Sequence, residues 1–330
     1  MNICTYRSNL EINRFQWKLL ADNALSANFF QTPECYDFYE TLSFLKPFVF
    51  GVSENSQLKG VICGYLIADG GKIKRFFSRR AIIHGGALLS NDISETALQE
   101  LLTTLKTELS SQSIYIEIRN YSDFSCRRQL MEENKFHYVQ HFDCWVDTTD
   151  ITTTFAHFSK SKQRQIVAAQ KAGFEWSATT DIDEITDYYR LLQNLYRTKV
   201  KRPLFPLEFF LKLSQYANGK LLVVKKSGKV VGGMACAVYP EKKMYEWFVC
   251  GGILATYAGM AYAAENKIPY FDFMGAGKPD EDYGVRKFKS KFGGKLVEYG
   301  RFLYICNNFL YRLGYWAIRY LYANEDHKGK

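Results

Sequence analysis

The sequence predicts an α/β (α+β) protein built from two copies of one unit, each a mostly antiparallel sheet with helices on its faces. Three observations support this prediction: the chain has 330 residues, 47% of them are hydrophobic, and its two halves contain segments with the same order of elements. At roughly 150 residues per domain, the length fits two domains. The apolar content excludes a disordered chain, a collagen and a minimal disulfide scaffold.

The repeated pattern begins at a proline in each half. Residues 33–66 and residues 206–238 each predict a helix opened by proline, an apolar strand, a polar turn and a strand rich in small residues. The turns SENSQ and KKSGK have the residue types of β-hairpins. Because the two segments lie about half the chain apart, we interpret them as copies of one unit. A chance match between generic hairpins is the alternative.

The elements that follow also correspond between the halves. A helix predicted over 95–109 precedes a strand over 113–120, and a helix over 259–267 precedes a strand over 268–275. Each half then carries another helix and a β-rich stretch, the first ending at 147 and the second at 305. We therefore expect domains over 1–150 and 151–330, because Thr and Asp cluster without periodicity over 147–155.

The net charge of +9 is unevenly distributed. Residues 1–150 contain 15 basic and 18 acidic side chains, whereas residues 151–330 contain 28 basic and 16 acidic ones. This distribution favours an anionic ligand or surface for the second half. A solvated basic face is the alternative.

The eight cysteines occur singly, without a C-x-x-C pair or a Cys/His cluster, so we expect no metal site. The N-terminus lacks the apolar core of a signal peptide, and no run of 18 apolar residues occurs. The expected location is therefore the reducing cytoplasm.

Two basic segments of the second half contain candidate binding residues. In the helix predicted to begin near Ser159, Lys162 lies on the apolar side, where it could either contact a ligand or extend its amine to solvent. The run YRTKVKRP contains Tyr196, Lys201 and Arg202, which could bind anionic groups such as phosphates. As a lone basic run, this second signal is weak.

The most informative stretch is residues 268–294. Asp272 lies in a strand so apolar that its carboxylate must find a partner, as a site residue or as a buried anchor. Gly275 then permits a tight turn or a close approach of the backbone to a ligand. In the following helix Lys289 falls on the apolar stripe, whereas Arg286 lies on the rest of the surface. Lys289 could stabilise a developing negative charge. The alternative is a salt bridge, with Asp272 as its partner.

The segments YFDFMG (270–275) and GVRKFKSKFGG (284–294) resemble the C-terminal signature of the Fem-type family of peptidoglycan interpeptide-bridge aminoacyltransferases. That family is built from two tandem N-acetyltransferase-like (GNAT-like) units. Residues 159–176, 78–90 and 29–36 are similar to further segments of the family, so the resemblance covers nearly the whole chain.

The resemblance implies transfer of an amino acid from aminoacyl-tRNA to an amine of a muropeptide or lipid-linked precursor, without a cofactor. Lys289 occupies the position of the family's signature lysine and would stabilise the tetrahedral oxyanion. Lys201 and Arg202 would contact phosphate or the precursor. Combined with the resemblance, the patterns above predict these substrate-binding residues: Asp272, Lys162, Tyr196, Lys201, Arg202, Gly275 and Arg286.

Two other functions stay open. An acyl-coenzyme A-dependent N-acyltransferase could use the same fold on another amine, although the usual pyrophosphate loop is missing. A non-catalytic RNA or anionic-lipid binding protein would use the basic second half, whereas we expect no DNA partner. The tail 307–322 could lie at the inner face of the membrane as an amphipathic helix, or dock onto the protein's own sheet.

Overall fold

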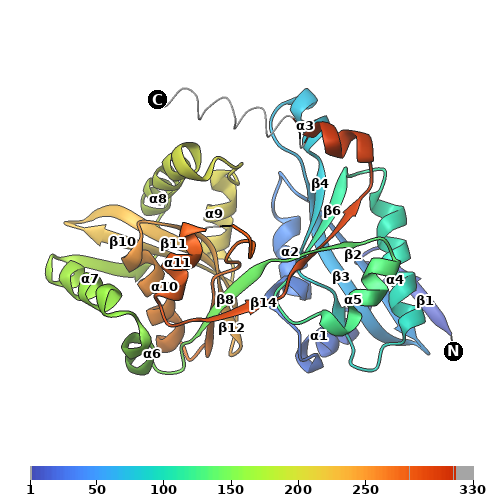
Figure 1. The fold of residues 1–330 in the computed structure, drawn as a ribbon, viewed down its shortest axis with the longest axis horizontal. Coiled ribbons are helices and arrows are strands. Elements are labelled where there is room, and N and C mark those ends of the chain that lie inside the picture. The colour runs from blue at the N-terminus through green and yellow to red at the C-terminus, as the bar shows by residue number, and fades with distance from the viewer. Residues whose placement is uncertain (1, 282, 315, 317–330) are drawn as a thin grey trace. The chain divides into compact units, whose positions relative to one another are not determined.

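The computed structural model describes residues 2–281, 283–314 and 316, and it confirms an α/β fold with two compact units. Unit 1 contains the described residues up to Val139 and from Gly300 onward, and unit 2 contains residues 140–299 (Figure 1). None of the described helices is both long enough and apolar enough to cross a membrane.

Unit 1 is built on a sheet whose described strands follow the order β1-β2-β3-β4-β6-β15-β7, with β5 paired to β3. Its strands are β1 (Ile3–Tyr6), β2 (Lys46–Glu54), β3 (Gln57–Ile67), β4 (Arg80–Gly85), β5 (Leu88–Leu89), β6 (Tyr115–Asn120), β7 (His137–Val139) and β15 (Arg301–Ile305). Its α-helices are α1 (Arg14–Asn23), α2 (Pro33–Glu40), α3 (Lys72–Ser78), α4 (Glu95–Leu109) and α5 (Arg128–Glu133).

Unit 2 is built on a sheet with the order β14-β8-β13-β12-β11-β10-β9. Its strands are β8 (Phe142–Asp147), β9 (Phe174–Ala178), β10 (Gly219–Lys226), β11 (Lys229–Tyr239), β12 (Lys243–Cys250), β13 (Tyr270–Asp272) and β14 (Lys295–Glu298). Its α-helices are α6 (Ile151–His157), α7 (Lys160–Lys171), α8 (Ile182–Leu195), α9 (Leu207–Gln215), α10 (Ile253–Glu265) and α11 (Gly284–Ser290), and a π-helical turn (Tyr196–Val200) follows α8.

The two sheets have the same strand order. Read from β1 in unit 1 and from β9 in unit 2, each sheet begins with four strands in antiparallel pairs and continues with a parallel pair. The parallel pairs are β4–β6 and β12–β13, and α4 and α10 connect their respective strands. A strand–helix–strand crossover of this kind is what a parallel pair requires. The duplicated unit predicted from the sequence is therefore confirmed.

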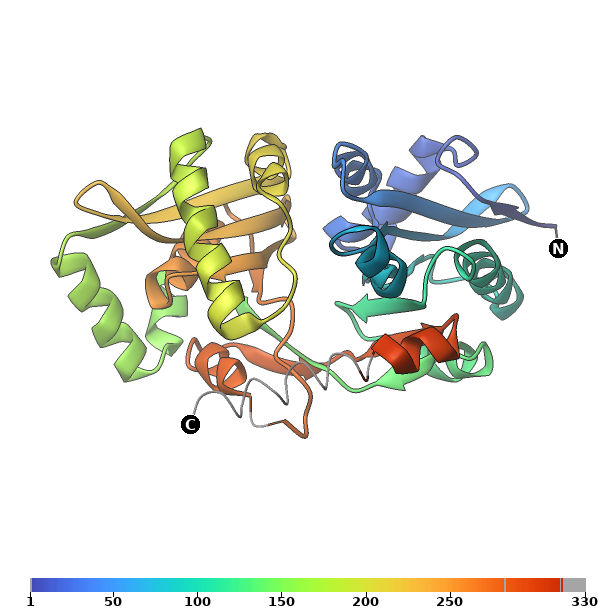
Figure 2. The ribbon, with the colours of Figure 1, turned by 90° about the horizontal axis from the view of Figure 1, so that it is seen from above.

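The division between the units differs from the expected 150/151 boundary. β8 pairs with β13 and β14 in unit 2, and β15 pairs with β6 and β7 in unit 1. Each half of the sequence thus sends a terminal strand into the other half's sheet, and Figures 1 and 2 show the chain passing between the units twice. Residues 147–155, expected to be a boundary, include the end of β8 and most of α6, whose first turn is capped by Asp150.

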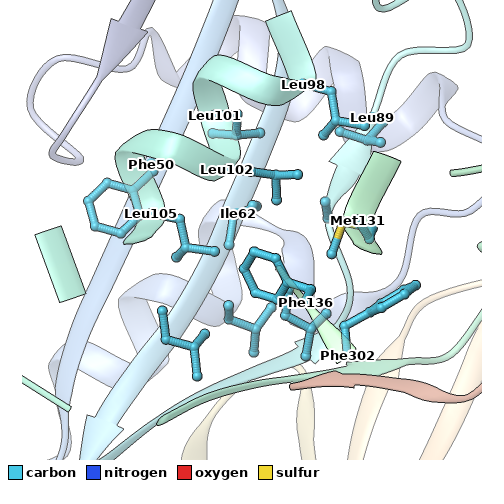
Figure 3. Packing of buried hydrophobic residues seen from close by; sticks show 14 of the residues in the cluster. Phe50, Ile62, Leu89, Leu98, Leu101, Leu102, Leu105, Met131, Phe136 and Phe302 are labelled. Atoms are coloured by element: carbon cyan, nitrogen blue, oxygen red, sulfur yellow. The ribbon is translucent and has the colours of Figure 1, made fainter. Parts of the chain in front are cut away.

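The core of unit 1 lies between its sheet and α4 (Figure 3). Leu98, Leu101, Leu102 and Leu105 recur at helical spacing on one face of α4 and are fully buried. Phe302 of β15 packs into the same cluster with no exposed surface. Burial of an aromatic ring this large contributes substantially to the stability of unit 1. The exchanged strand is therefore an integral part of that unit's core.

Most local predictions agree with the structure. α4 covers residues 95–109 as predicted, and both predicted hairpins form, each with two turn residues at positive φ: Asn55, Ser56, Ser227 and Gly228. The predicted strand over 268–275 is shorter, because β13 ends at Asp272 and Met274 has a φ of 54°. The predicted helix over 259–267 begins earlier, at Ile253.

Candidate functional site

The strand–turn–helix segment from β13 to α11 forms the centre of the candidate site in unit 2. Beyond β13 the backbone turns through Met274, Gly275 and Gly277, whose φ values are 54°, 118° and 81°. Glycine tolerates this region of conformational space because it has no Cβ. A Cβ on Gly277 would also lie 2.6 Å from the Tyr283 ring, so this turn packs closely against the start of α11.

Lys289 extends from α11 back to this turn and is 8% exposed. Its Nζ donates hydrogen bonds to the carbonyl oxygens of Phe273, at 2.7 Å, and Gly275, at 2.9 Å. Its third neighbour is Glu246 Oε1 of β12, at 3.4 Å. An ammonium group has three N–H donors. Two of them are therefore held by the backbone turn, and the third is directed to a longer ionic contact.

Lys289 forms a salt bridge, as in the alternative given by the sequence, but its partner is not Asp272. Lys289 pairs with Glu246, whereas Asp272 Oδ2 accepts from Lys243 Nζ at 3.1 Å. Asp272 Oδ1 accepts from the backbone N–H of Met274 at 2.8 Å, and the residue has no exposed surface. This is the buried-anchor alternative: Asp272 stabilises the turn that Lys289 contacts.

Two further carboxyl groups lie buried around this turn. Asp143 Oδ1 of β8 accepts from the N–H groups of Gly275, at 2.8 Å, and Cys144, at 2.7 Å. Asp143 Oδ2 and Glu246 Oε2 are buried without a hydrogen-bond partner. Burial and the negative charge of Asp272 raise the pKa of Asp143 to about 8, and burial also raises the pKa of Glu246. Both acids therefore accept protons more readily than exposed carboxylates.

Lys162 of α7 packs against two aromatic rings in and just after α11. Lys162 lies on the inner face of α7 as predicted, with its Nζ 3.7 Å from the centre of the Phe288 ring and 5.0 Å from that of Phe292. Burial and the charge of nearby Lys291 lower its pKa to about 8. No carboxylate among the described residues lies within salt-bridge distance of Lys162. Its amine therefore lies against aromatic faces, a favourable cation–π arrangement.

Arg286 holds the loop that precedes α11. Its guanidinium donates to the carbonyl oxygens of Ala276, Lys278, Pro279 and Glu281. It also lies 5.0 Å from the centre of the Phe142 ring. The predicted substrate-binding arginine thus has its donors directed to the protein's own backbone, where it positions the glycine turn.

The second candidate feature of unit 2 is a pocket along α8 and the π-helical turn. It has a volume of about 490 Å³, and its lining residues are Tyr189, Arg190, Gln193, Asn194, Tyr196, Arg197 and Leu204. Two arginines and two tyrosines in one pocket suit an anionic ligand with a planar group. The predicted residue Tyr196 lines this pocket, and burial raises its pKa to about 12.

Lys201 and Arg202 follow the π-helical turn and are exposed. Lys201 adopts a left-handed conformation with a φ of 53°, and its N–H donates to the carbonyl of Tyr196 at 2.7 Å. Tyr196 also lies close to β12, the strand that carries Glu246: its ring is 6.2 Å from that of Phe248, two residues from Glu246. Strand β12 thus supports both features of the site.

Sequence reasoning missed Asp143, Glu246, Lys243 and Arg190, and it did not single out Arg197 within the basic run YRTKVKRP. A signal was available for the acids, because Asp143 and Glu246, like Asp272, lie beside aromatic residues in apolar strands. Arg190 gave no such signal, since α8 has an ordinary polar face, whereas Arg197 belongs to the basic run already identified. Among the described residues, no cluster of His, Cys, Asp and Glu side chains could hold a metal ion.

Comparisons with known proteins identify the fold. Neither a protein-family model nor a curated protein sequence matches the chain. The structure of FemX is similar with a TM-score of 0.68 and 14% identity, over 95% of this chain and 99% of that one. A tandem GNAT protein from the clavulanic acid biosynthesis pathway has a TM-score of 0.56 and 8% identity, over 93% of this chain and 99% of that one. L-PGS from Bacillus licheniformis has a TM-score of 0.55 and 13% identity, over 93% of this chain and 96% of that one. The chain therefore has the tandem GNAT-like fold seen in FemX.

Proposed function

We propose that the protein is an N-acyltransferase that transfers an amino acid from aminoacyl-tRNA to an amine of a muropeptide or lipid-linked precursor. The observation that carries this proposal is Lys289, a buried amine held by two carbonyls of a glycine turn. The turn lies at the end of the parallel pair in unit 2, in a chain with the fold of FemX. On this proposal the protein works in the cytoplasm, in peripheral contact with the inner face of the membrane.

In this reaction the acceptor amine attacks the ester carbonyl, a C–N bond forms, and the C–O bond to the ribose breaks. The carbonyl oxygen carries negative charge in the tetrahedral intermediate, and a positioned cation in a site with little water stabilises that charge. The contact of Lys289 with Glu246, at 3.4 Å, is longer than its two carbonyl contacts. We therefore infer that its third N–H turns to the oxyanion, while the ribose oxygen takes up the proton that the amine releases.

The pocket around Tyr196 supports an anionic substrate. Arg190 and Arg197 supply guanidinium groups that can bind phosphate through paired hydrogen bonds, and Lys201 and Arg202 follow directly in the chain. A nucleotide-linked or lipid-linked precursor carries such phosphates. This proposal assigns the positive charge of residues 151–330 to substrate recognition.

An acyl-coenzyme A donor is the second candidate, favoured by the N-terminus of α10. No side chain caps this helix, and an ideal Cβ on its N-cap residue Gly252 meets no atom within 4 Å. Exposed N–H groups at a helix N-terminus can bind a pyrophosphate. In unit 1 the corresponding helix α4 is capped by its own Ser94, so of these two crossover helices α10 is the one whose first N–H groups have no side-chain cap.

The test measures transfer by the full-length protein with charged tRNA or coenzyme A thioesters as donors and muropeptide precursors as acceptors. Lys289→Met should lower kcat about 10²–10³-fold, the effect of removing one oxyanion donor. Lys291→Met is the matched control, because Lys291 is an exposed lysine two residues away. Wild-type rates in Lys289→Met would refute the assignment, and transfer from thioesters alone would establish the second candidate.

A further inference from the structure

Helix α3 of unit 1 has an exposed apolar face. Ile73, Phe76 and Phe77 are 79%, 48% and 41% exposed, and no residue of α3 is buried. Their spacing of three and four residues places them on one side of the helix. Large apolar side chains gathered on one exposed helix face indicate an interaction surface.

A second exposed apolar stripe lies on the segment that follows β15. Residues 308–314 are helical, and Phe309, Leu313 and Trp316 are 74%, 44% and 73% exposed. Their spacing of four and three residues again defines one face. The other side of this segment docks onto unit 1: Leu310 is buried, and the Tyr311 ring lies 5.7 Å from a tyrosine ring of β6. The buried side of this segment therefore fixes the position of the exposed stripe on unit 1.

The two segments are neighbours. A Cβ on Gly314 would lie 3.9 Å from the carbonyl oxygen of Phe77, and Figures 1 and 2 show α3 beside the red helix after β15. Together they form what we call the apolar–basic surface, whose apolar members are Ile73, Phe76, Phe77, Phe309, Leu313 and Trp316.

The charged side chains of α3 and of residues 307–316 are all positive. Lys72, Lys74 and Arg75 flank the apolar face of α3, and Arg312 lies beside the second stripe. Neither 70–80 nor 307–316 contains an acidic residue. The guanidinium of Arg79 also stacks 4.5 Å above the Phe76 ring. Apolar side chains on one face, flanked by Lys and Arg, are the pattern of segments that lie in the headgroup region of an anionic membrane.

We propose that the apolar–basic surface binds an anionic lipid bilayer, with its apolar side chains in the interface and its basic side chains on lipid phosphates. A second copy of the chain fits less well, because two such surfaces would bring like charges together. RNA fits less well too, because its bases could stack on the rings of this surface but would leave the exposed aliphatic side chains of Ile73 and Leu313 without a partner. This inference does not depend on the transfer reaction, since binding to lipid is measured without any substrate.

The test is flotation of the full-length protein with two kinds of vesicle: pure phosphatidylcholine, and equal parts phosphatidylcholine and phosphatidylglycerol. The wild type should bind only the anionic vesicles, and less so as salt rises. Ile73→Ser/Phe76→Ser/Phe77→Ser should weaken binding at least about tenfold, as should Phe309→Ser/Trp316→Ser from the other segment. Brominated lipids should quench the fluorescence of the wild type more than that of Trp316→Phe.

The matched control is Leu10→Ser/Leu25→Ser, which removes two apolar side chains of the same unit that are even more exposed, at 96% and 92%. It should bind as the wild type does. Circular dichroism checks that every variant is folded. Three results would overturn the proposal. The first is that the wild type does not bind anionic vesicles, and the second is that the α3 variant binds them as well as the control does. The third is that the α3 variant still binds vesicles but loses a dimer or RNA binding that the wild type shows.

Discussion

Replacing Lys289 by methionine should destabilise unit 2 by about 3–5 kcal/mol, the usual cost of removing one partner from a buried ion pair. The structure supports this magnitude because Glu246 is 5% exposed and its second oxygen already lacks a hydrogen-bond partner. Without Lys289, both oxygens of a buried carboxylate would be unpaired. The carbonyl oxygens of Phe273 and Gly275 would also lose their donor.

A double-mutant cycle isolates the pair. Glu246→Gln removes the charge that Lys289→Met leaves unpaired, so the double variant should be more stable than the sum of the two single losses predicts, by about 0.5–3 kcal/mol. Urea unfolding at neutral pH measures the free energies, and hydrogen exchange of peptides from residues 140–299 assigns the loss to unit 2.

The deficit of Lys289→Met should also depend on pH. Burial raises the folded-state pKa of Glu246, so the protonated form is favoured in the folded protein. The deficit should therefore shrink as pH falls and Glu246 becomes neutral, and grow as pH rises. Additive losses in the cycle, or a deficit that does not change with pH, would refute the reasoning that Glu246 is the ionic partner of Lys289.

Three further predictions follow from the structure. Asp143, whose folded pKa is raised to about 8, should favour folding below about pH 4 and lose that contribution as pH rises to 8. Asp143→Asn should therefore flatten the dependence of the unfolding free energy on pH in this range, and it should raise the unfolding free energy at pH 8 by at least about 1 kcal/mol. An unchanged slope would contradict the raised pKa. Phe302→Ala should lower the free energy of unfolding by about 3–5 kcal/mol and reduce hydrogen-exchange protection in unit 1, although residue 302 belongs to the second half of the sequence. Leu296→Ala, on exposed β14, is the control and should cost little. Protection lost from unit 2 would contradict the strand exchange. Gly277→Ala should cost about 1–2 kcal/mol, because φ is 81° and the new Cβ would meet the Tyr283 ring at 2.6 Å; a thermal scan matching the wild type would show that the turn relaxes freely.

The local chemistry of the chain could be predicted from its sequence. Helix α4 has Ser94 as its N-cap and leucines at helical spacing, so its limits were predictable to the residue. The hairpins were predictable because turn residues lie between alternating apolar runs. Lys289 was identified by its place on an apolar stripe, and the structure shows it buried as that stripe requires.

The partners of the buried charges could not be predicted in the same way. Spacing along a helix or strand shows which side chains share a face, but it does not show which strands are neighbours in a sheet. Lys289 and Asp272 are close in sequence, yet each finds its ion-pair partner on β12, a strand that ends well before β13 begins. Asp143 reaches the same turn from β8, more than a hundred residues away.

By itself, the sequence determined the repeated unit, its α/β class and the single lysine on which the proposed chemistry rests. These depend on periodicity, capping and turn residues, which act over a few neighbouring positions. Only the tertiary structure decided that β8 and β15 are exchanged between the units, that Glu246 faces Lys289, and that two apolar stripes from distant segments meet on unit 1. The physical reason is that strand pairing and burial join positions far apart in the chain, and no local pattern specifies which of them will meet.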